Sequence, residues 1–142
     1  MGTMDDVALT EEDAALLWAL AYNTHDPAVL APILAEEVRV MSRWVIRDLV
    51  GRDAYLDYLG RKFATFEREG SLVRVEVAAT PGTGERPCAL LEQDGVLLAT
   101  VLFDVIGGRL SQVTMAEEPP PASCRRSGHY PGFEEGITEQ VN

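Results

Sequence analysis

Hydrophobic positions recur with a helical period in the N-terminal half of the chain. Thr10-Glu11-Glu12-Asp13 has the form of a capping box. After it, apolar residues follow at spacings of three and four: Ala14, Leu17, Trp18, Ala21 and Tyr22. A second such stripe lies in 52–69, between Gly51 and Gly70, and consists of Tyr55, Leu56, Leu59, Phe63 and Phe66. Between these two helices, Asp26-Pro27 predicts a short third one, with a cap and a first-turn proline.

From Val73 onward the period changes to two, which is typical of strands. Residues 73–77 alternate between valine and charged side chains. Asp94-Gly95 separates two apolar runs, 88–93 and 96–106, and Gly107-Gly108 precedes a third, 109–116. Both dipeptides tolerate positive φ and predict hairpin turns. Residues 38–41 and 44–50 are also rich in β-branched and aromatic side chains. The pattern predicts an α+β fold with three N-terminal helices packed on an antiparallel sheet.

Two-residue turns fix the register of the last three strands, so both faces of this sheet can be written down. One face carries Cys88, Leu90, Glu92, Leu97, Ala99, Val101, Phe103, Val105, Leu110, Gln112 and Thr114. The other carries Ala89, Leu91, Gln93, Leu98, Thr100, Leu102, Asp104, Ile106, Ser111, Val113 and Met115. Both are largely apolar, whereas a half-solvated sheet alternates. The helices can cover one face. We expect the other, centred on Val101, Phe103 and Val105, to pair with a second copy of the chain in a homodimer.

Composition divides the chain into three parts. We expect residues 1–9 to form an N-terminal extension, 10–116 one domain, and 117–142, which is rich in Pro, Ser, Gly and acids, a tail. The tail either folds back over an apolar surface or is disordered, and we assign no chemistry to its His129 and Tyr130. If it covers the second sheet face, its deletion causes aggregation.

The charge of the chain limits its partners. The formal net charge is −11, with 12 Lys and Arg against 23 Asp and Glu. Nucleic acids and anionic membranes attract basic surfaces, so we expect neither as a partner. No signal segment and no membrane-spanning apolar run stand out, which predicts a cytoplasmic protein. Cys88 and Cys124 show neither CxxC nor Cys-His spacing, so we expect no metal site.

Several segments together carry a resemblance to a known family: Trp18 through Asn23 with Asp26, the run 30–40, Gly51-Arg-Asp-Ala-Tyr-Leu-Asp-Tyr-Leu, and the last hairpin with Gly108-Arg109. Over residues 10–115 the chain resembles the nuclear transport factor 2-like superfamily, in its SnoaL-like and ketosteroid-isomerase-like branch. The resemblance implies a cone-shaped fold, in which helices and the concave face of a curved sheet enclose an apolar pocket. It also implies homodimers formed through the sheet.

The three functional groups of the ketosteroid isomerases are absent at the corresponding positions. Trp18 stands where these enzymes carry an oxyanion tyrosine, Ser42 where they carry the aspartate base, and Leu102 where they carry a protonated aspartate. A serine cannot abstract a carbon-bound proton unaided, and leucine offers no polar group. We therefore expect no steroid isomerase activity.

The resemblance places other polar groups in the pocket. If the concave face bears Leu102, then Thr100 and Asp104 point into the cavity, and SnoaL-like cyclases use a pocket aspartate as acid and base. Asp104 is thus the candidate catalytic residue, unless it lies at the wet rim and pairs with Arg109 or Ser111. The predicted pocket residues are Trp18, Tyr22, Trp44, Tyr55, Thr100, Leu102 and Met115.

Three further residues allow two interpretations each. Arg43 and Arg47 either clamp a ligand carboxylate or face solvent. His25 is either a general base or part of a solvated turn.

Two functions follow from the whole pattern. The first is binding of an apolar or aromatic small molecule, with or without cofactor-free acid/base catalysis of cyclase, isomerase or hydratase type. The alternative is a non-catalytic dimerisation or accessory domain with a vestigial or regulatory pocket.

Overall fold

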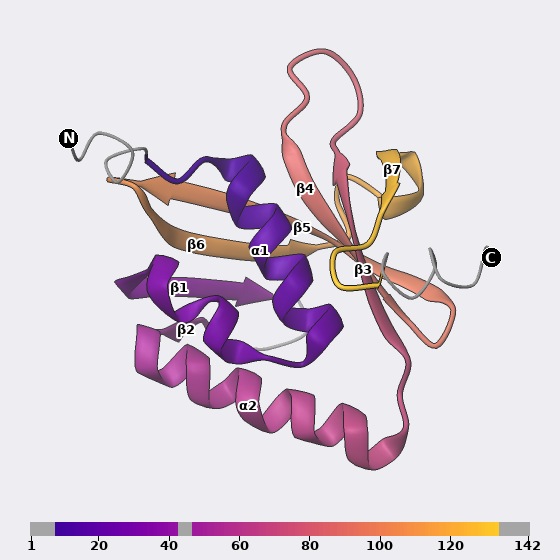
Figure 1. Ribbon diagram of the computed structural model, residues 1–142. Helices are drawn as coiled ribbons and strands as arrows, with labels where there is room; N and C mark the ends of the chain where they lie inside the picture. Colours follow the sequence, from indigo (N-terminus) through magenta and orange to yellow (C-terminus); the bar gives the residue numbers. More distant parts are fainter. Residues whose placement is uncertain (1–7, 43–46, 134–142) are drawn as a thin grey trace.

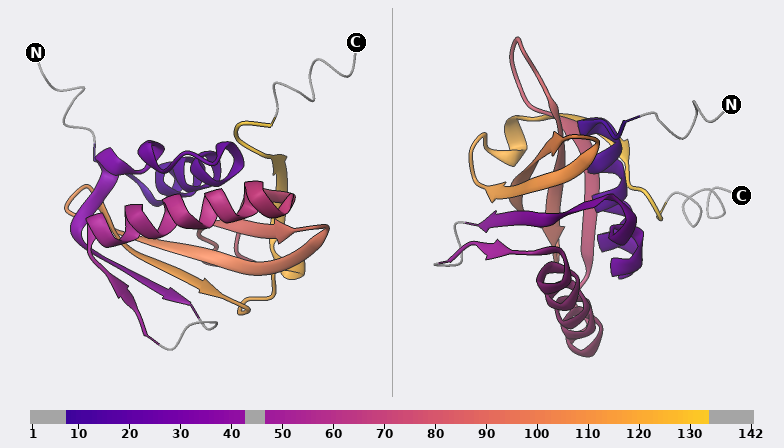
Figure 2. Two further views of the ribbon diagram at one scale, coloured as in Figure 1. Left: turned by 90° about the horizontal axis from the view of Figure 1, so that it is seen from below. Right: turned by 90° about the vertical axis from the view of Figure 1, so that its left-hand side faces the viewer.

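A computed structural model describes residues 8–42 and 47–133 (Figure 1). Two α-helices, α1 (Glu11–Thr24) and α2 (Arg52–Glu69), lie on one face of a seven-stranded sheet (Figure 2). Single 3-10 turns occur at η2 (Pro27–Val29), η3 (Ala31–Ile33) and η4 (Pro121–Ser123). The strands are β1 (Leu34–Ser42), β2 (Leu49–Val50), β3 (Val73–Ala79), β4 (Pro87–Gln93), β5 (Val96–Ile106), β6 (Arg109–Ala116) and β7 (Arg125–His129). No helix among the described residues is long and apolar enough to cross a membrane.

The two long helices begin and end where the sequence predicts. Thr10 and Asp13 form the predicted capping box, with the Asp13 amide donating to the Thr10 hydroxyl at 3.0 Å. Gly70 ends α2 in the left-handed conformation at φ 69°. The predicted helix between them starts at the predicted Asp26 cap but is not continuous, because the segment forms two short 3-10 helices. Each turn carries a proline near its start, and Pro32, which lacks an amide hydrogen, prevents a continuous helix through the segment.

The sheet is mixed rather than antiparallel. Its strand order is β2-β1-β6-β5-β4-β3-β7, and β1 runs parallel to β6, with Val40 opposite Val113. All other neighbouring strands are antiparallel. The prediction of a purely antiparallel sheet is therefore wrong at this one pairing, which joins segments that are far apart in the chain.

Two bulges correct the predicted faces of the sheet. Leu98 is the extra residue of β5 opposite β4, and Ser111 is the extra residue of β6 opposite β5. The face toward the helices is consequently largely apolar over these strands, with Ala89, Leu91, Ala99, Val101, Phe103, Val113 and Met115, and it also carries the polar Gln93 at the end of β4. The opposite face is mixed: Cys88, Leu90, Thr100, Leu102, Asp104, Gln112 and Thr114. The sequence pattern predicted two apolar faces because β5 was assigned to the wrong side.

This correction removes the predicted dimer interface. Val101 and Phe103 are fully buried and Val105 packs against the same core, so none of the three is available to a second chain. Phe103 lies against Trp18 of α1 with ring centroids 5.8 Å apart.

Part of the segment that composition assigned to a tail covers the outer face instead. Cys124 packs against Cys88 and Leu90, and Leu102 borders this cluster. The Thr100 hydroxyl donates to the carbonyl oxygen of Pro119 at 2.6 Å. Beyond Cys124, β7 adds to the free edge of β3 (Figure 2). Of the two alternatives for the tail, folding back holds for residues 117–133.

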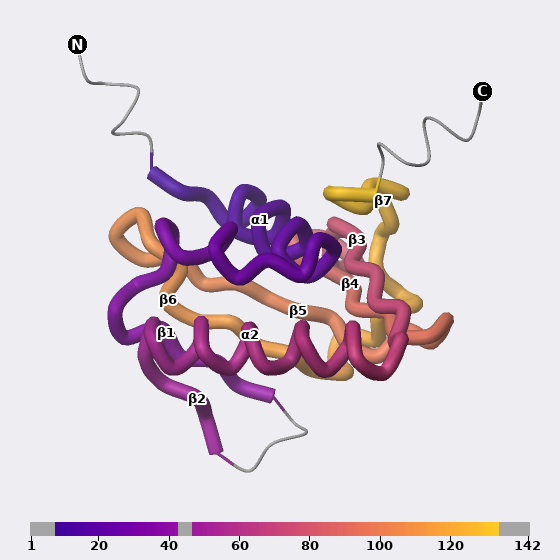
Figure 3. The backbone as a smooth tube through the Cα atoms, turned by 60° about the horizontal axis from the view of Figure 1, so that its bottom comes forward, coloured from indigo at the N-terminus to yellow at the C-terminus, as the bar shows by residue number. Residues whose placement is uncertain are grey.

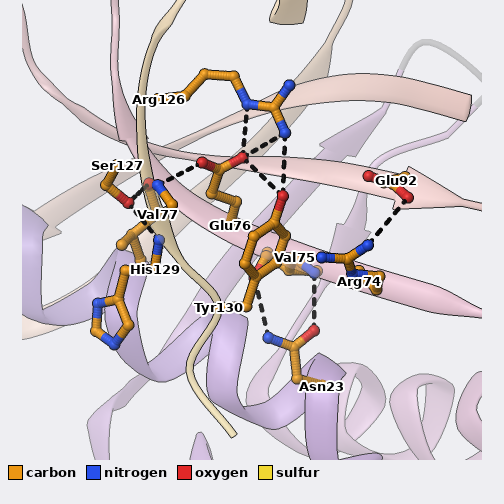
Figure 4. A network of polar contacts seen from close by, with 11 residues as sticks. Asn23, Arg74, Val75, Glu76, Val77, Glu92, Arg126, Ser127, His129 and Tyr130 are labelled. Carbon is orange, nitrogen blue, oxygen red and sulfur yellow. Dashed lines mark hydrogen bonds and ion pairs between the residues drawn. The ribbon is translucent and has the colours of Figure 1, made fainter. Parts of the chain in front are cut away.

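A buried carboxylate fastens β7 to the sheet (Figure 4). Glu76 of β3 is only 2% exposed, and its oxygens accept hydrogen bonds from Arg126 Nε at 2.6 Å, the Gly128 amide at 2.7 Å and the Tyr130 hydroxyl at 3.2 Å. Asn23, near the end of α1, donates to the carbonyl oxygens of Val75 and Pro131. The segment after Cys124 is therefore held by specific polar contacts with β3 and with α1.

Candidate functional site

A cavity of about 590 Å³ lies between α2 and the concave face of the sheet. The two elements face one another in Figure 3, where α2 runs along the strands. The cavity is lined by Tyr22, Val40, Ser42, Arg47, Asp48, Leu49, Tyr55, Tyr58, Lys62, Phe66, Leu91, Gln93, Leu98 and Met115. Most of these side chains are apolar or aromatic, and the volume falls in the range of small-molecule sites, about 300–1,000 Å³.

The hydroxyl of Tyr55 has a fixed orientation in this cavity. Tyr55 comes from the first turn of α2 and is 1% exposed. The indole Nε1 of Trp18 donates a hydrogen bond to the Tyr55 oxygen at 2.9 Å. Since the oxygen is the acceptor in that contact, the Tyr55 hydroxyl hydrogen is left to donate elsewhere. Trp18 itself is fully buried behind the cavity wall.

Tyr22 places a second phenol in the same cavity. Its ring stacks on Trp18 at 4.0 Å between centroids and meets Phe63 edge-on at 4.9 Å, and the residue is 1% exposed. Across residues 8–42 and 47–133, its hydroxyl makes no hydrogen bond. A buried hydroxyl without a partner costs free energy. The Tyr22 hydroxyl is therefore the polar group of the wall that a ligand would satisfy.

Burial reinforces the neutral state of both phenols. It raises the pKa of Tyr22 and of Tyr55 well above their usual range, and the proximity of Tyr58 raises both further. The hydrogen bond from Trp18 opposes this shift for Tyr55 without cancelling it. Both groups therefore stay neutral at physiological pH and act as hydrogen-bond donors rather than as bases.

Charged side chains lie only around part of the cavity wall. Lys62 of α2 holds its Nζ 5.5 Å from the ring centroid of Tyr58 and 5.4 Å from that of Phe66. Asp48 accepts a hydrogen bond from Arg39 at 2.9 Å, which neutralises its charge. Arg47 also belongs to the lining, and its side chain is exposed.

The structure brings together some of the predicted pocket residues and separates others. Tyr22, Tyr55 and Met115 line the cavity, and Trp18 supports Tyr55 from behind. Thr100 and Leu102 lie on the opposite face of the sheet, against the C-terminal segment, so their predicted orientation is wrong. Trp44 and Arg43 lie outside the described residues.

Asp104 also lies on the face of the sheet that is opposite the cavity. Its carboxylate accepts hydrogen bonds from Arg86 at 3.3 Å and from Gln112 at 3.1 Å, and its side chain is 41% exposed. Asp104 is thus partly exposed and paired with an arginine, as the rim alternative expected, but the partners of its carboxylate are Arg86 and Gln112 rather than Arg109. The Ser111 hydroxyl donates to the backbone oxygen of Asp104 instead of its carboxylate.

His25 belongs to the turn after α1. It caps the helix at φ 55° in the left-handed region, and its Nδ1 lies 3.0 Å from an oxygen of Glu67. It does not line the cavity. This is the turn interpretation of the two that the sequence left open.

The predicted pocket residues include Tyr55 of α2 but not the next two residues along the same side of this helix. Lys62 and Phe66 line the cavity one and two turns after Tyr58. A signal was present, since residues 58, 62 and 66 are spaced by four and share one side of a helix. Leu98 also lines the cavity. It does so because of the bulge in β5, for which the sequence contains no signal.

A second hollow, of about 650 Å³, lies between the start of α1 and the Gly107-Gly108 turn. Its two ionisable lining residues already have partners, because Asp13 accepts from the Thr10 amide and Arg109 donates to the Pro32 carbonyl oxygen. None of the described residues that line this hollow offers a buried polar group without a partner, comparable with the Tyr22 hydroxyl. Within the described parts of the chain, no three His, Cys, Asp or Glu side chains form a group that could hold a metal ion.

Comparison with known proteins rests on structure. No protein-family model and no curated protein matches the chain. A nuclear transport factor 2-like protein of unknown function from Mesorhizobium loti is similar, with TM-score 0.57, 20% identity, and 75% of this chain and 90% of that chain covered. A SnoaL-like protein of unknown function from Burkholderia thailandensis gives TM-score 0.57, 14% identity and coverage of 83% and 95%.

A third solved structure was determined with a bound small molecule. It is a hypothetical protein of ketosteroid isomerase-like fold from Catenulispora acidiphila, in complex with trimethylamine, with TM-score 0.53, 14% identity and coverage of 75% and 85%. These similarities confirm the resemblance that the order of elements suggested. The chain therefore has a nuclear transport factor 2-like fold.

Proposed function

We propose that this protein binds an apolar or aromatic small molecule in the cavity between α2 and the concave face of the sheet. The observation that carries the proposal is the Tyr22 hydroxyl, which is buried in the cavity wall without a hydrogen-bond partner among the described residues. Together with Tyr55 it presents two neutral donors to a ligand acceptor such as a carbonyl or ether oxygen. The largely apolar wall supplies the rest of the binding free energy through burial of ligand surface.

The fold supports the proposal without specifying the ligand. The Catenulispora acidiphila neighbour holds trimethylamine, so a protein of this architecture can take up a small molecule. At 14% identity the neighbour says nothing about which molecule this chain prefers, because function depends on the side chains of the site.

Binding is better supported than acid/base catalysis. The two buried phenols are donors at neutral pH, and Asp48, the one carboxylate among the described residues of the cavity lining, is paired with Arg39. An acid/base enzyme needs a group that changes protonation near the reacting atoms. Asp104 does not supply it from the opposite face of the sheet, so we do not assign it a catalytic role.

The test uses a neutral aromatic ligand with one hydrogen-bond acceptor, 2-acetylnaphthalene, titrated into the purified protein by calorimetry. We expect saturable binding at one site. Tyr22→Phe should weaken binding by about tenfold, the worth of one buried hydrogen bond of about 1.4 kcal/mol. Naphthalene, which has no acceptor, should lose nothing in the variant.

An Asp104→Asn variant is the control, since it changes a polar group outside the cavity. Its affinity for 2-acetylnaphthalene should equal that of the unmodified protein. If 2-acetylnaphthalene and naphthalene both fail to bind, the accessory-domain alternative is favoured. If Asp104→Asn weakens binding while Tyr22→Phe does not, the site has been placed on the wrong face of the sheet.

A further inference from the structure

Lys62 and its neighbour Arg61 differ in what surrounds them on α2. Arg61 is 68% exposed and forms an ion pair with Asp57, one turn earlier. Lys62 has Tyr58 one turn earlier and Phe66 one turn later, so its ammonium lies over two aromatic rings of the cavity wall instead of beside an acid. A cation above such rings is attracted by their electron density. The ammonium is thereby held at the cavity.

The charges around the cavity have a sign opposite to that of the whole chain. The formal net charge is −11, yet among the described residues the charged members of the lining are Arg47, Lys62 and Asp48. Asp48 is neutralised by Arg39. Within the part of the chain that the structure describes, neither Arg47 nor Lys62 has a carboxylate within ion-pair distance. Two uncompensated cations therefore line a cavity that is otherwise apolar.

A ligand that satisfies all of these groups has a definite chemistry. Its body is apolar and aromatic, and it meets the phenols of Tyr22 and Tyr55. Its remaining end carries a negative charge, which Lys62 and Arg47 would receive through charge-assisted hydrogen bonds. A cationic ligand would leave both side chains unpaired and repelled.

We infer that the cavity selects an aromatic molecule that carries one carboxylate, with Lys62 and Arg47 as the residues that determine this preference. The inference rests on the proposed function and goes further, because it names the ligand class and the residues that distinguish it. Lys62 is the stronger contributor, since its ammonium is held at the cavity wall by two rings while Arg47 is exposed.

The test compares three ligands with the same ring system and different charge: 2-naphthoate, 2-naphthamide and 2-naphthyltrimethylammonium. We expect 2-naphthoate to bind about tenfold more tightly than 2-naphthamide, as for one charge-assisted contact of partly exposed groups. The ammonium compound should bind least. Because exposed charges are screened, the preference for the carboxylate should shrink between about 50 mM and about 500 mM salt.

Matched variants separate a specific contact from a general effect of charge. Lys62→Gln should reduce the preference for 2-naphthoate over 2-naphthamide to about twofold and leave the affinity for 2-naphthamide unchanged. Arg47→Gln should act in the same direction and more weakly. Arg61→Gln removes the same charge one residue away on α2 and should leave the preference intact.

The outcomes distinguish the inference from the proposed function on which it rests. If none of the three ligands binds, the proposed function fails. If 2-naphthoate and 2-naphthamide bind equally, or if the ammonium compound binds most tightly, the proposed function stands and the carboxylate preference is wrong. Equal losses of the preference in Lys62→Gln and Arg61→Gln would show a general charge effect and would also overturn the inference.

Discussion

Two buried tyrosines line the same cavity, but only one of their hydroxyl groups contributes to the stability of the fold. The Tyr55 oxygen accepts the only hydrogen bond of the Trp18 indole within the described structure, whereas the Tyr22 hydroxyl has no partner there. Removal of the Tyr55 hydroxyl leaves the buried Trp18 N–H without an acceptor. Removal of the Tyr22 hydroxyl leaves no buried group without a partner. Contacts alone therefore predict that one phenol serves the fold and the other serves the ligand.

This difference can be measured in the protein without ligand. We predict that Tyr55→Phe lowers the free energy of unfolding by about 1–3 kcal/mol, because the Trp18 N–H is left unsatisfied. Tyr22→Phe should leave it unchanged or raise it, since the variant removes a buried polar group that lacks a partner. Urea unfolding followed by tryptophan fluorescence gives both values. A loss for Tyr22→Phe as large as that for Tyr55→Phe would show that the protein itself satisfies the Tyr22 hydroxyl.

At the scale of elements, the sequence predicts correctly those helix and strand boundaries that depend on neighbouring residues. The capping box of α1, the bounds of α2 between Gly51 and Gly70, and the strands β5 and β6 all follow from caps, turns and periodicity. The parallel pairing of β1 with β6 depends on tertiary packing and has no local signal. Turn chemistry fixed the register next to each turn, but a bulge farther along each hairpin shifted it by one residue.

That shift accounts for the misplaced part of the site. Leu98, the extra residue of the first bulge, is an ordinary strand residue, without the glycine that marks some bulges. The one-residue offset moved Thr100, Leu102 and Asp104 to the wrong face. Tyr22, Tyr55 and Met115 line the cavity, and their placement follows from helical periodicity and from the strand after Gly108, neither of which depends on the register between β4 and β5.

The attachment of β7 is open to a direct test. Arg126→Met removes the cation that pairs with Glu76, whose carboxylate is almost completely buried. Breaking a buried pair is costly, and because Arg126 is 42% exposed we expect a reduced loss of about 1–3 kcal/mol in the free energy of unfolding. Hydrogen exchange should accelerate in Arg125–His129 and at the edge of β3. Arg125→Met is the control, since Arg125 pairs with the exposed Glu85; equal acceleration in both variants would contradict a specific role for Glu76.

At the scale of the whole molecule, the chain covers part of its own outer sheet face. The cluster of Cys88, Leu90 and Cys124 takes the place that a second copy of the chain would otherwise fill. The reason for expecting a homodimer through an uncovered apolar face is therefore weaker than the sequence alone suggested, since the outer face is mixed and partly covered.

Truncation separates self-coverage from dimerisation. A chain that ends at residue 116 exposes Cys88 and Leu90, and we predict that it self-associates at micromolar concentration in sedimentation velocity. The full chain and a chain that ends at residue 133 should both sediment as monomers. A full-length dimer would show that the remaining outer surface pairs two copies, and a monodisperse truncated chain would show that the C-terminal segment is not needed as a cover.

The opposite placement of the cavity and of the C-terminal segment on the two faces of one sheet has a consequence for how this protein can change. Tyr58, Lys62, Leu98 and Met115 line the cavity, and none of them contacts Glu76 or the cluster around Cys124. Substitutions at separate sites without shared partners have nearly additive effects. These four positions of the cavity lining can therefore vary, one residue at a time, while the segment that completes the sheet stays as it is. In an architecture of this kind, mutations at these positions can create new ligand preferences without requiring compensating mutations that restore the stability of the fold.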